Sequence, residues 1–278
     1  MKMVSINNVS GNSAVLASLR KINSDLSTTQ TRIGTGYKVN SASDNAAVWT
    51  MAQGIRSDIK GQDSLAGNIA VAKGKADTAV TALDTVNKLM GSIKELADDA
   101  KSNPPASYTS VIAKITALQA QITSVISGSS FQGDNFLDPT TPGATSVNIG
   151  VSGGVAQTLS VTTIDVTANA AYVAAMAAPT NQATVEALAG PAGLVATAQT
   201  ALNTYQSTLS GFSSSLEVQG DFLASLKSIR ETALSSLVDA NLEEESAKVT
   251  SLQVKQQLAY QALSIGNSSA QNVLQLFQ

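Results

Sequence analysis

Both ends of this chain have the pattern of amphipathic helices, and neither end has a globular core of its own to cover. Near the start, apolar residues recur at steps of three and four, and Thr29 completes the series: Val15, Leu19, Ile22, Leu26 and Ile33. Near the end, an apolar face continues almost to the carboxyl terminus: Leu252, Leu258, Leu263, Val273, Leu274, Leu276 and Phe277. Chain termini normally fray rather than pack. The pattern therefore predicts that the two ends bury each other, or bury themselves against copies of the same protein.

The composition excludes several classes of function. The chain has no Cys and no His, so disulfide frameworks, thiolate metal sites, imidazole proton shuttles and Ser/His/Asp triads are absent. Its 17 basic and 20 acidic residues give a formal charge of -3. This charge gives no electrostatic reason to expect nucleic acid or an anionic membrane as a partner. Neither a cleaved signal peptide nor a membrane span is expected. We therefore predict no catalytic, cofactor-binding or metal-binding residues, and no enzyme activity.

Glycine and proline divide the rest of the chain into long helices. A turn at Gly34–Gly36 interrupts the first helix, and a second begins after Ser41–Ser43. A looser patch is expected around Gly61, Gly67 and Gly74. A regular heptad series follows it: Ala79, Leu83, Val86, Met90, Ile93, Ala97 and Ala100. Pro104 and Pro105 end that helix, and another is expected through residues 111–125.

The middle of the chain changes to short alternations of polar and apolar residues. Residues 128–166 predict two to four short strands, and a helix over 168–178 is expected to follow. Long helix returns over 195–237. The predicted fold is mainly α: an elongated rod of long coiled-coil helices from both chain ends with a small β-rich insert. The expected division is a terminal domain from residues 1–45 and 236–278, and a rod domain over 46–235 with its β region at about 128–170.

Two segments just inside the ends resemble the terminal signatures of bacterial flagellins. Residues 32–47 are similar to the N-terminal signature, and residues 237–240, 244–247, 252–253 and 256–267 are similar to the C-terminal one. The likeness continues inward through 93–97 and 131–137. Val48 with Trp49 resembles the short flagellins of alphaproteobacteria. Two spaced signatures in the right order make this a specific signal.

The resemblance implies a secreted structural subunit that polymerises into the extracellular flagellar filament for swimming motility. The terminal helices would form an inner coiled-coil tube. The implied partners are the chain itself, the flagellar cap and hook-junction proteins, and an export chaperone at the C-terminal helix; neither nucleic acid nor membrane is expected. The residues that we expect at the polymerisation interface are Leu19, Ile22, Leu26, Arg32, Ile33, Val39, Asn40, Asp44, Asn45, Leu258, Leu263, Leu274, Leu276 and Phe277.

Several alternatives stay open. A hook-filament junction protein would have similar ends, and an enzyme on a helical scaffold is disfavoured by the missing His and Cys. Asp44 and Asn45 fit a helix N-cap as well as a lattice contact. Glu243–Glu245 are expected to be a solvated or subunit-facing stripe, and Trp49 a packing residue or a subunit contact. Ser92 stands where enteric-type relatives carry Arg, which predicts weak recognition by the innate immune receptor for flagellin.

Overall fold

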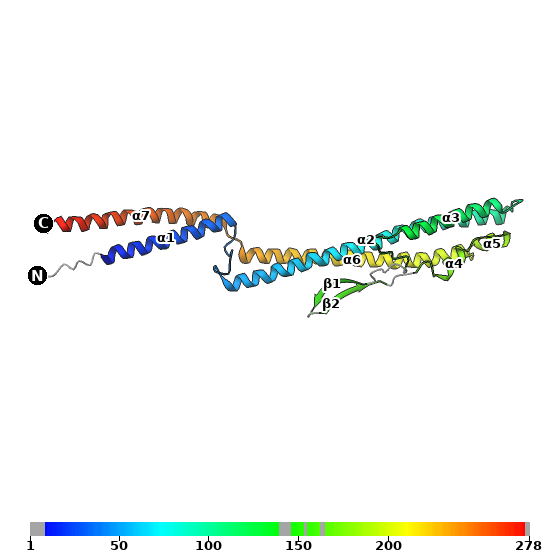
Figure 1. Ribbon diagram of the computed structural model, residues 1–278, viewed down its shortest axis with the longest axis horizontal. Helices are drawn as coiled ribbons and strands as arrows, with labels where there is room; N and C mark the ends of the chain where they lie inside the picture. The colour runs from blue at the N-terminus through cyan, green and yellow to red at the C-terminus, as the bar shows by residue number, and fades with distance from the viewer. Residues whose placement is uncertain (1–8, 139–145, 153–154, 162–164, 276–278) are drawn as a thin grey trace. The chain divides into compact units, whose positions relative to one another are not determined.

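The computed structural model describes all residues except 1–8, 139–145, 153–154, 162–164 and 276–278, and these described residues form seven helices and two strands (Figure 1). In chain order the elements are α1 (Val9–Thr35), α2 (Ala46–Ser102), α3 (Thr109–Gly128), β1 (Ser146–Ser152), β2 (Val155–Ser160), α4 (Ala170–Ala175), α5 (Gln182–Leu188), α6 (Leu194–Val238) and α7 (Leu242–Gln275). The predicted class, mainly α with a small β insert, is confirmed.

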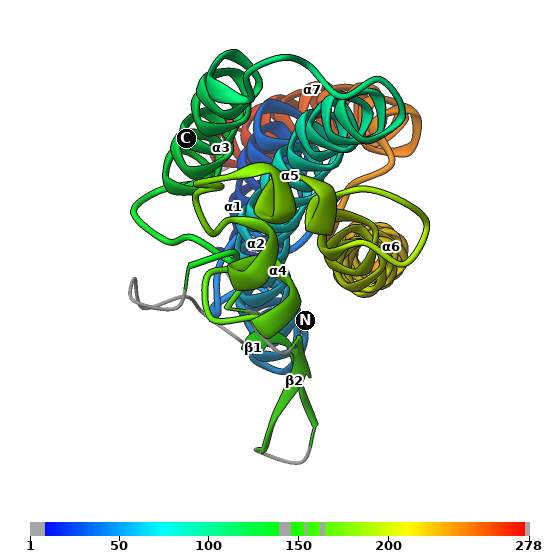
Figure 2. The same cartoon turned by 90° about the vertical axis from the view of Figure 1, so that its right-hand side faces the viewer.

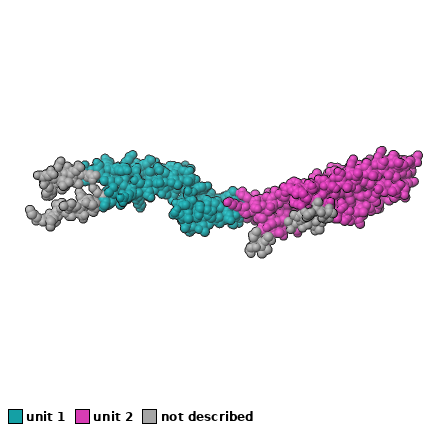
Figure 3. All heavy atoms as spheres, in the orientation of Figure 1, with its two compact units in different colours: residues 1–59, 228–278 teal, residues 60–227 magenta. Residues whose placement is uncertain are grey.

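The chain separates into two compact units, and each contains residues from both halves of the sequence (Figure 3). Unit 1 consists of residues 1–59 and 228–278, and unit 2 consists of residues 60–227. The long helices α2 and α6 contribute to both units. Unit 1 joins two segments from opposite ends of the chain and depends on contacts between residues far apart in the sequence, whereas unit 2 is one continuous segment.

The core of unit 2 is a seam between α2 and α6, with α3 packed beside it. The predicted heptad of α2, from Ala79 to Ala100, is buried at every position. The members of α6 and α3 that close this core are Val195, Ala198, Leu202, Leu209, Leu216, Ile115, Ile122 and Ile126. The two long helices run antiparallel, because Lys227 pairs with Asp63 at 2.6 Å and Asn87 donates to Asn203 at 2.9 Å.

The glycine-rich part of α2 is helical without a break, where the sequence predicted a looser patch. Its tertiary partners supply the order that glycine does not favour. Packing explains the glycine at position 74, since a Cβ added to Gly74 would lie 3.2 Å from Cζ of Phe131. Gly61 and Gly67 have nothing within 4 Å of that position, so no neighbour requires a glycine there.

The β insert is a two-stranded antiparallel hairpin that projects from the helices (Figures 1 and 2). A bulge between Asn148 and Gly150 shifts its register. In the segment before the hairpin, a tight turn pairs the backbones of Phe131 and Asp134, and the side chain of Lys75 on α2 forms an ion pair with Asp134. The insert is thereby fastened to α2 at its base.

Two short helices follow the hairpin, and asparagine caps both. Asn169 accepts from the amides of Ala171 and Tyr172, which begins α4 inside the predicted range 168–178. Asn181 forms a capping box with Thr184 at the start of α5, a helix that the sequence analysis missed. Both helices present buried side chains to the α2–α6 seam.

Candidate polymerisation interface

In unit 1, α1 and α7 pair as two antiparallel helices. Leu19 and Thr29 of α1 and Leu252 of α7 are buried, while Ile22 and Leu26 are half-buried. The amide of Gln256 donates to Oδ1 of Asn23, near the middle of α1, at 2.6 Å. The two chain ends therefore cover each other on one side, which was one of the two outcomes that their apolar patterns predicted.

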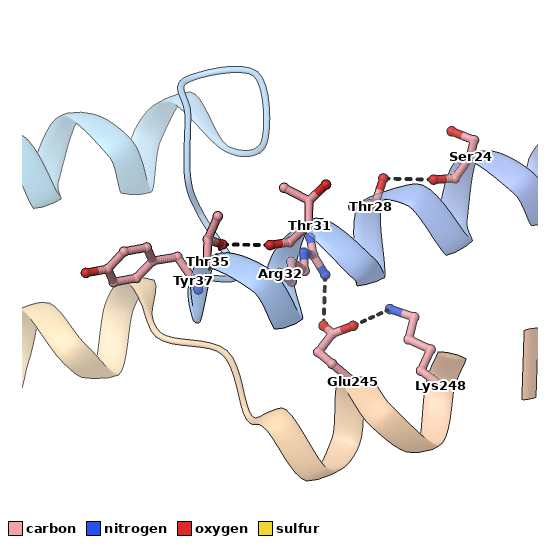
Figure 4. A network of polar contacts seen from close by, with 8 residues as sticks. All are labelled: Ser24, Thr28, Thr31, Arg32, Thr35, Tyr37, Glu245 and Lys248. Carbon is pink, nitrogen blue, oxygen red and sulfur yellow. Dashed lines mark hydrogen bonds and ion pairs between the residues drawn. The ribbon is translucent and has the colours of Figure 1, made fainter. Parts of the chain in front are cut away.

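An ion pair fixes the register of the two helices (Figure 4). Nη1 of Arg32 donates to Oε1 of Glu245 at 3.2 Å, and Lys248 lies 3.9 Å from the other carboxylate oxygen. The Glu245 side chain is 10% exposed and that of Arg32 is 29% exposed. Glu245 thus differs from its exposed neighbours Glu243 and Glu244, and it does not belong to a solvated stripe.

The two loops that connect the terminal helices to the long helices are joined by backbone bonds. The amides of Lys38 and Val39 donate to the carbonyl of Val238, and the amide of Ala240 donates to the carbonyl of Gly36. Gly36 has a φ of 74°, which explains why glycine follows α1 at this turn. Val39 is buried with Ala52 and Val238 in a small core.

Trp49 packs against that small core from α2. The guanidinium carbon of Arg56 lies 5.4 Å from the centre of its ring, within the range of a cation–π contact. The packing interpretation of Trp49 is therefore confirmed within the chain.

Asp44 and Asn45 have different roles at the start of α2. Oδ1 of Asn45 accepts from the amide of Val48 at 3.1 Å, which is an N-cap bond. Oδ2 of Asp44 instead accepts from the amides of Asn40 and Ser41, inside the loop. These bonds, that from Ser41 first, hold the pKa of Asp44 below its ordinary value. The capping prediction is confirmed for Asn45, whereas Asp44 stabilises the preceding turn.

The face of α7 directed away from α1 carries a second set of apolar side chains. Val254, Leu258 and Ile265 are 51%, 58% and 64% exposed, and their spacing places them on one side of the helix. Buried Leu252 and half-buried Leu263 lie on the opposite side. We call Val254, Leu258 and Ile265 the outer stripe. Of the outer stripe, only Leu258 was among the residues predicted for the apolar face near the carboxyl terminus. The spacing of four and seven residues was the signal that could have found Val254 and Ile265.

The predicted interface residues thus fall into three groups. The first group is covered within the chain: Leu19 and Val39 are buried, and Ile22, Leu26, Arg32, Ile33 and Leu263 are half-buried. Asn40, Asp44, Asn45 and Leu258 are exposed. Leu274 lies on α7, and its side chain is outside the described part, as are Leu276 and Phe277 altogether.

The described residues form neither a metal-binding cluster nor a membrane-spanning helix. Over residues 9–138 and the later described segments, no three Asp or Glu side chains gather as a metal site would require. None of the helices in that part has the length and apolar character needed to span a membrane.

The fold and this site define a class: a helical structural subunit whose paired ends leave an apolar stripe exposed. Residues 6–141 match the bacterial flagellin N-terminal helical region, and residues 192–277 match the bacterial flagellin C-terminal helical region. The chain is 33% identical to flagellin FljM of Caulobacter vibrioides over the full length of both. It is 32% identical to a flagellin of Brucella melitensis, covering 99% of this chain and 100% of that one. Flagellin C of Rhizobium meliloti is 32% identical, with 95% and 96% covered. The chain belongs to the bacterial flagellins, the structural subunits of the extracellular flagellar filament.

Proposed function

We propose that this chain polymerises with itself through its terminal helices, which form the inner coiled-coil tube of the filament. The observation that carries the proposal is the outer stripe of α7. Val254, Leu258 and Ile265 remain exposed after α1 and α7 have paired, and grouped apolar side chains of this kind mark contact surfaces. Docking them against further copies would remove that surface from water at about 25 cal/mol per Å².

We propose further that the chain is exported before it assembles and that a chaperone covers its C-terminal helix until then. The cap and hook-junction proteins occupy the ends of the polymer. A surface that drives assembly outside the cell must be covered inside it, and the outer stripe is the surface in question. The C-terminal helix is therefore the segment on which we expect the chaperone to bind.

Seeded polymerisation tests the role of the outer stripe. Full-length protein is heated to monomer, seeded with short filament fragments and examined by electron microscopy. We expect long tubes of uniform diameter for the wild type, and for Leu258→Ser a critical concentration raised by about ten-fold or more. Gln257→Ser is the matched control, since Gln257 is exposed on the same turn and is polar.

Two outcomes would contradict the proposal. A Leu258→Ser chain that polymerises like the wild type would show that the outer stripe does not take part in assembly. Wild-type protein that stays monomeric or adds only a short cap to the seeds would favour the hook-filament junction alternative, since a junction protein is needed in about one ring.

A further inference from the structure

Unit 2 has an exposed apolar patch of its own on α6. Val218 and Phe222 are 69% and 57% exposed, although Leu216 and Leu223 on the other side of the same helix are buried against α2. Residues four apart lie on one face of a helix, so Val218 and Phe222 form a single patch. Asp221 borders it, is exposed and makes no ion pair among the described residues. Two large apolar side chains exposed side by side are typical of a contact surface, and a charged side chain at their border is compatible with its polar rim.

The outward face of α2 complements this patch in shape. Ser64 and Gly67 are exposed and lie on one side of the helix, three residues apart. An added Cβ at Gly67 would meet nothing within 4 Å, so a side chain from outside can approach the backbone closely. Large apolar side chains pack well onto a surface of small residues, because they bury more of their area there.

The two surfaces are also complementary in charge. Lys60 lies one turn before Ser64 on the same face of α2, is exposed and forms no ion pair within the described part of the chain. The patch on α6 carries Asp221 as its free charge, and the face of α2 carries Lys60. Opposite charges at matching surfaces favour one partner and one orientation.

We propose that Val218 and Phe222 of one copy pack onto the α2 face of a second copy, over its Ser64 and Gly67, with Asp221 opposite its Lys60. The inference rests on the proposed function, since it adds a contact in unit 2 to the contact of the terminal helices. All of these residues lie within residues 60–227, so this contact does not require the outer stripe.

The arrangement favours an open polymer over a closed dimer. The two surfaces lie on different helices, so a copy that offers its α6 patch keeps its own α2 face free for another copy. Such a heterologous contact continues from subunit to subunit unless its rotation closes a ring. A second copy is the occupant because this chain carries both halves of the contact.

Disulfide trapping tests the contact directly, because the natural chain has no Cys. A Ser64→Cys chain and a Phe222→Cys chain are mixed, assembled on wild-type seeds and oxidised. We expect a disulfide-linked heterodimer in the mixture and only monomer from either variant alone. The matched control combines Ser64→Cys with Ser207→Cys, an exposed serine elsewhere on α6, and should stay monomeric. Tubes without heterodimer would overturn the inference and leave the proposed function standing. Wild-type protein that forms no tubes would overturn both.

A charge exchange supplies a second, independent measurement. Asp221→Lys alone and Lys60→Asp alone should each raise the critical concentration for assembly by about two- to five-fold, the range of a single ion pair at a surface. The double variant should return toward the wild-type value. Both positions are exposed, so the melting temperature of the monomer should not change. Single variants that assemble like the wild type, or a double variant that assembles worse than either, would overturn the inference.

Discussion

At the scale of single residues, Gln132 has the least favourable backbone conformation. Its φ is 53°, the only positive value outside glycine in the described residues, and Gly133 follows at 89°. The left-handed region costs an ordinary residue about 1–2 kcal/mol, and hairpin turns of this kind favour Asn-Gly. We expect Gln132→Gly to raise the free energy of unfolding by about 0.5–1 kcal/mol in urea denaturation. This gain is smaller than the cost of the left-handed conformation, because glycine also adds entropy to the unfolded chain.

A substitution of opposite sign is the control for Gln132. Gln121 is exposed on α3, where the backbone is helical, so Gln121→Gly should lower the free energy of unfolding by about 1 kcal/mol. Equal effects at both positions would mean that the turn of Phe131–Asp134 stores no strain.

Asp44 makes the stability of unit 1 depend on pH in the acid range. Bonds from the amides of Ser41 and Asn40 hold the pKa of Asp44 below its ordinary 3.8. Because the folded state favours the carboxylate, its contribution is complete above the unfolded-state pKa and is lost as the pH falls through the folded-state pKa. Below about pH 4 we expect the melting temperature of Asp44→Asn, measured by circular dichroism, to fall less than that of the wild type. Acid profiles that run parallel for both proteins would contradict this.

At the scale of elements, the pair Arg32–Glu245 sets the register of α1 against α7. Glu245→Ala would leave Arg32 without its carboxylate, and we expect it to lower the free energy of unfolding of unit 1 by about 1–2 kcal/mol, less than for a fully buried pair because Arg32 is partly exposed. Arg32→Met combined with Glu245→Leu should recover most of that loss. Hydrogen exchange of α1 amides measures the effect within unit 1.

Glu243→Ala is the control for this experiment, because Glu243 is exposed on the same turn of α7 and should be neutral. A double variant that loses as much as the sum of its two single variants would show that the ion pair carries no coupling energy between the helices.

The heptads of α2 and α6 and the ends of the helices at Gly36 and Pro104 were predictable, because periodicity and backbone restriction act locally. The two sides of α7 were not separated in the sequence analysis, since Leu252, Leu258 and Leu263 are all apolar and only the partner decides which is covered. The burial of Glu245 was missed for the same reason. Its Arg32 partner lies 213 residues away in the sequence, beyond any local pattern.

At the scale of the whole chain, assembly and folding of the middle should separate. Deletion of residues 265–278 removes Ile265 of the outer stripe together with Leu274, Leu276 and Phe277. It leaves residues 60–227, which have their own core of buried α2, α3 and α6 side chains. We therefore expect the truncated protein to keep a cooperative thermal transition and most of its helical circular dichroism.

The same truncated protein should fail to elongate seeds in electron microscopy, because the apolar surface that remains on α7 is too small to offset the cost of ordering the terminal helices. Ile265→Ser in the full-length chain separates the loss of the stripe from the loss of chain length, and it should elongate seeds at an intermediate critical concentration. Truncated chains that still form long tubes would place the terminal contact elsewhere on α1 and α7, N-terminal to residue 265.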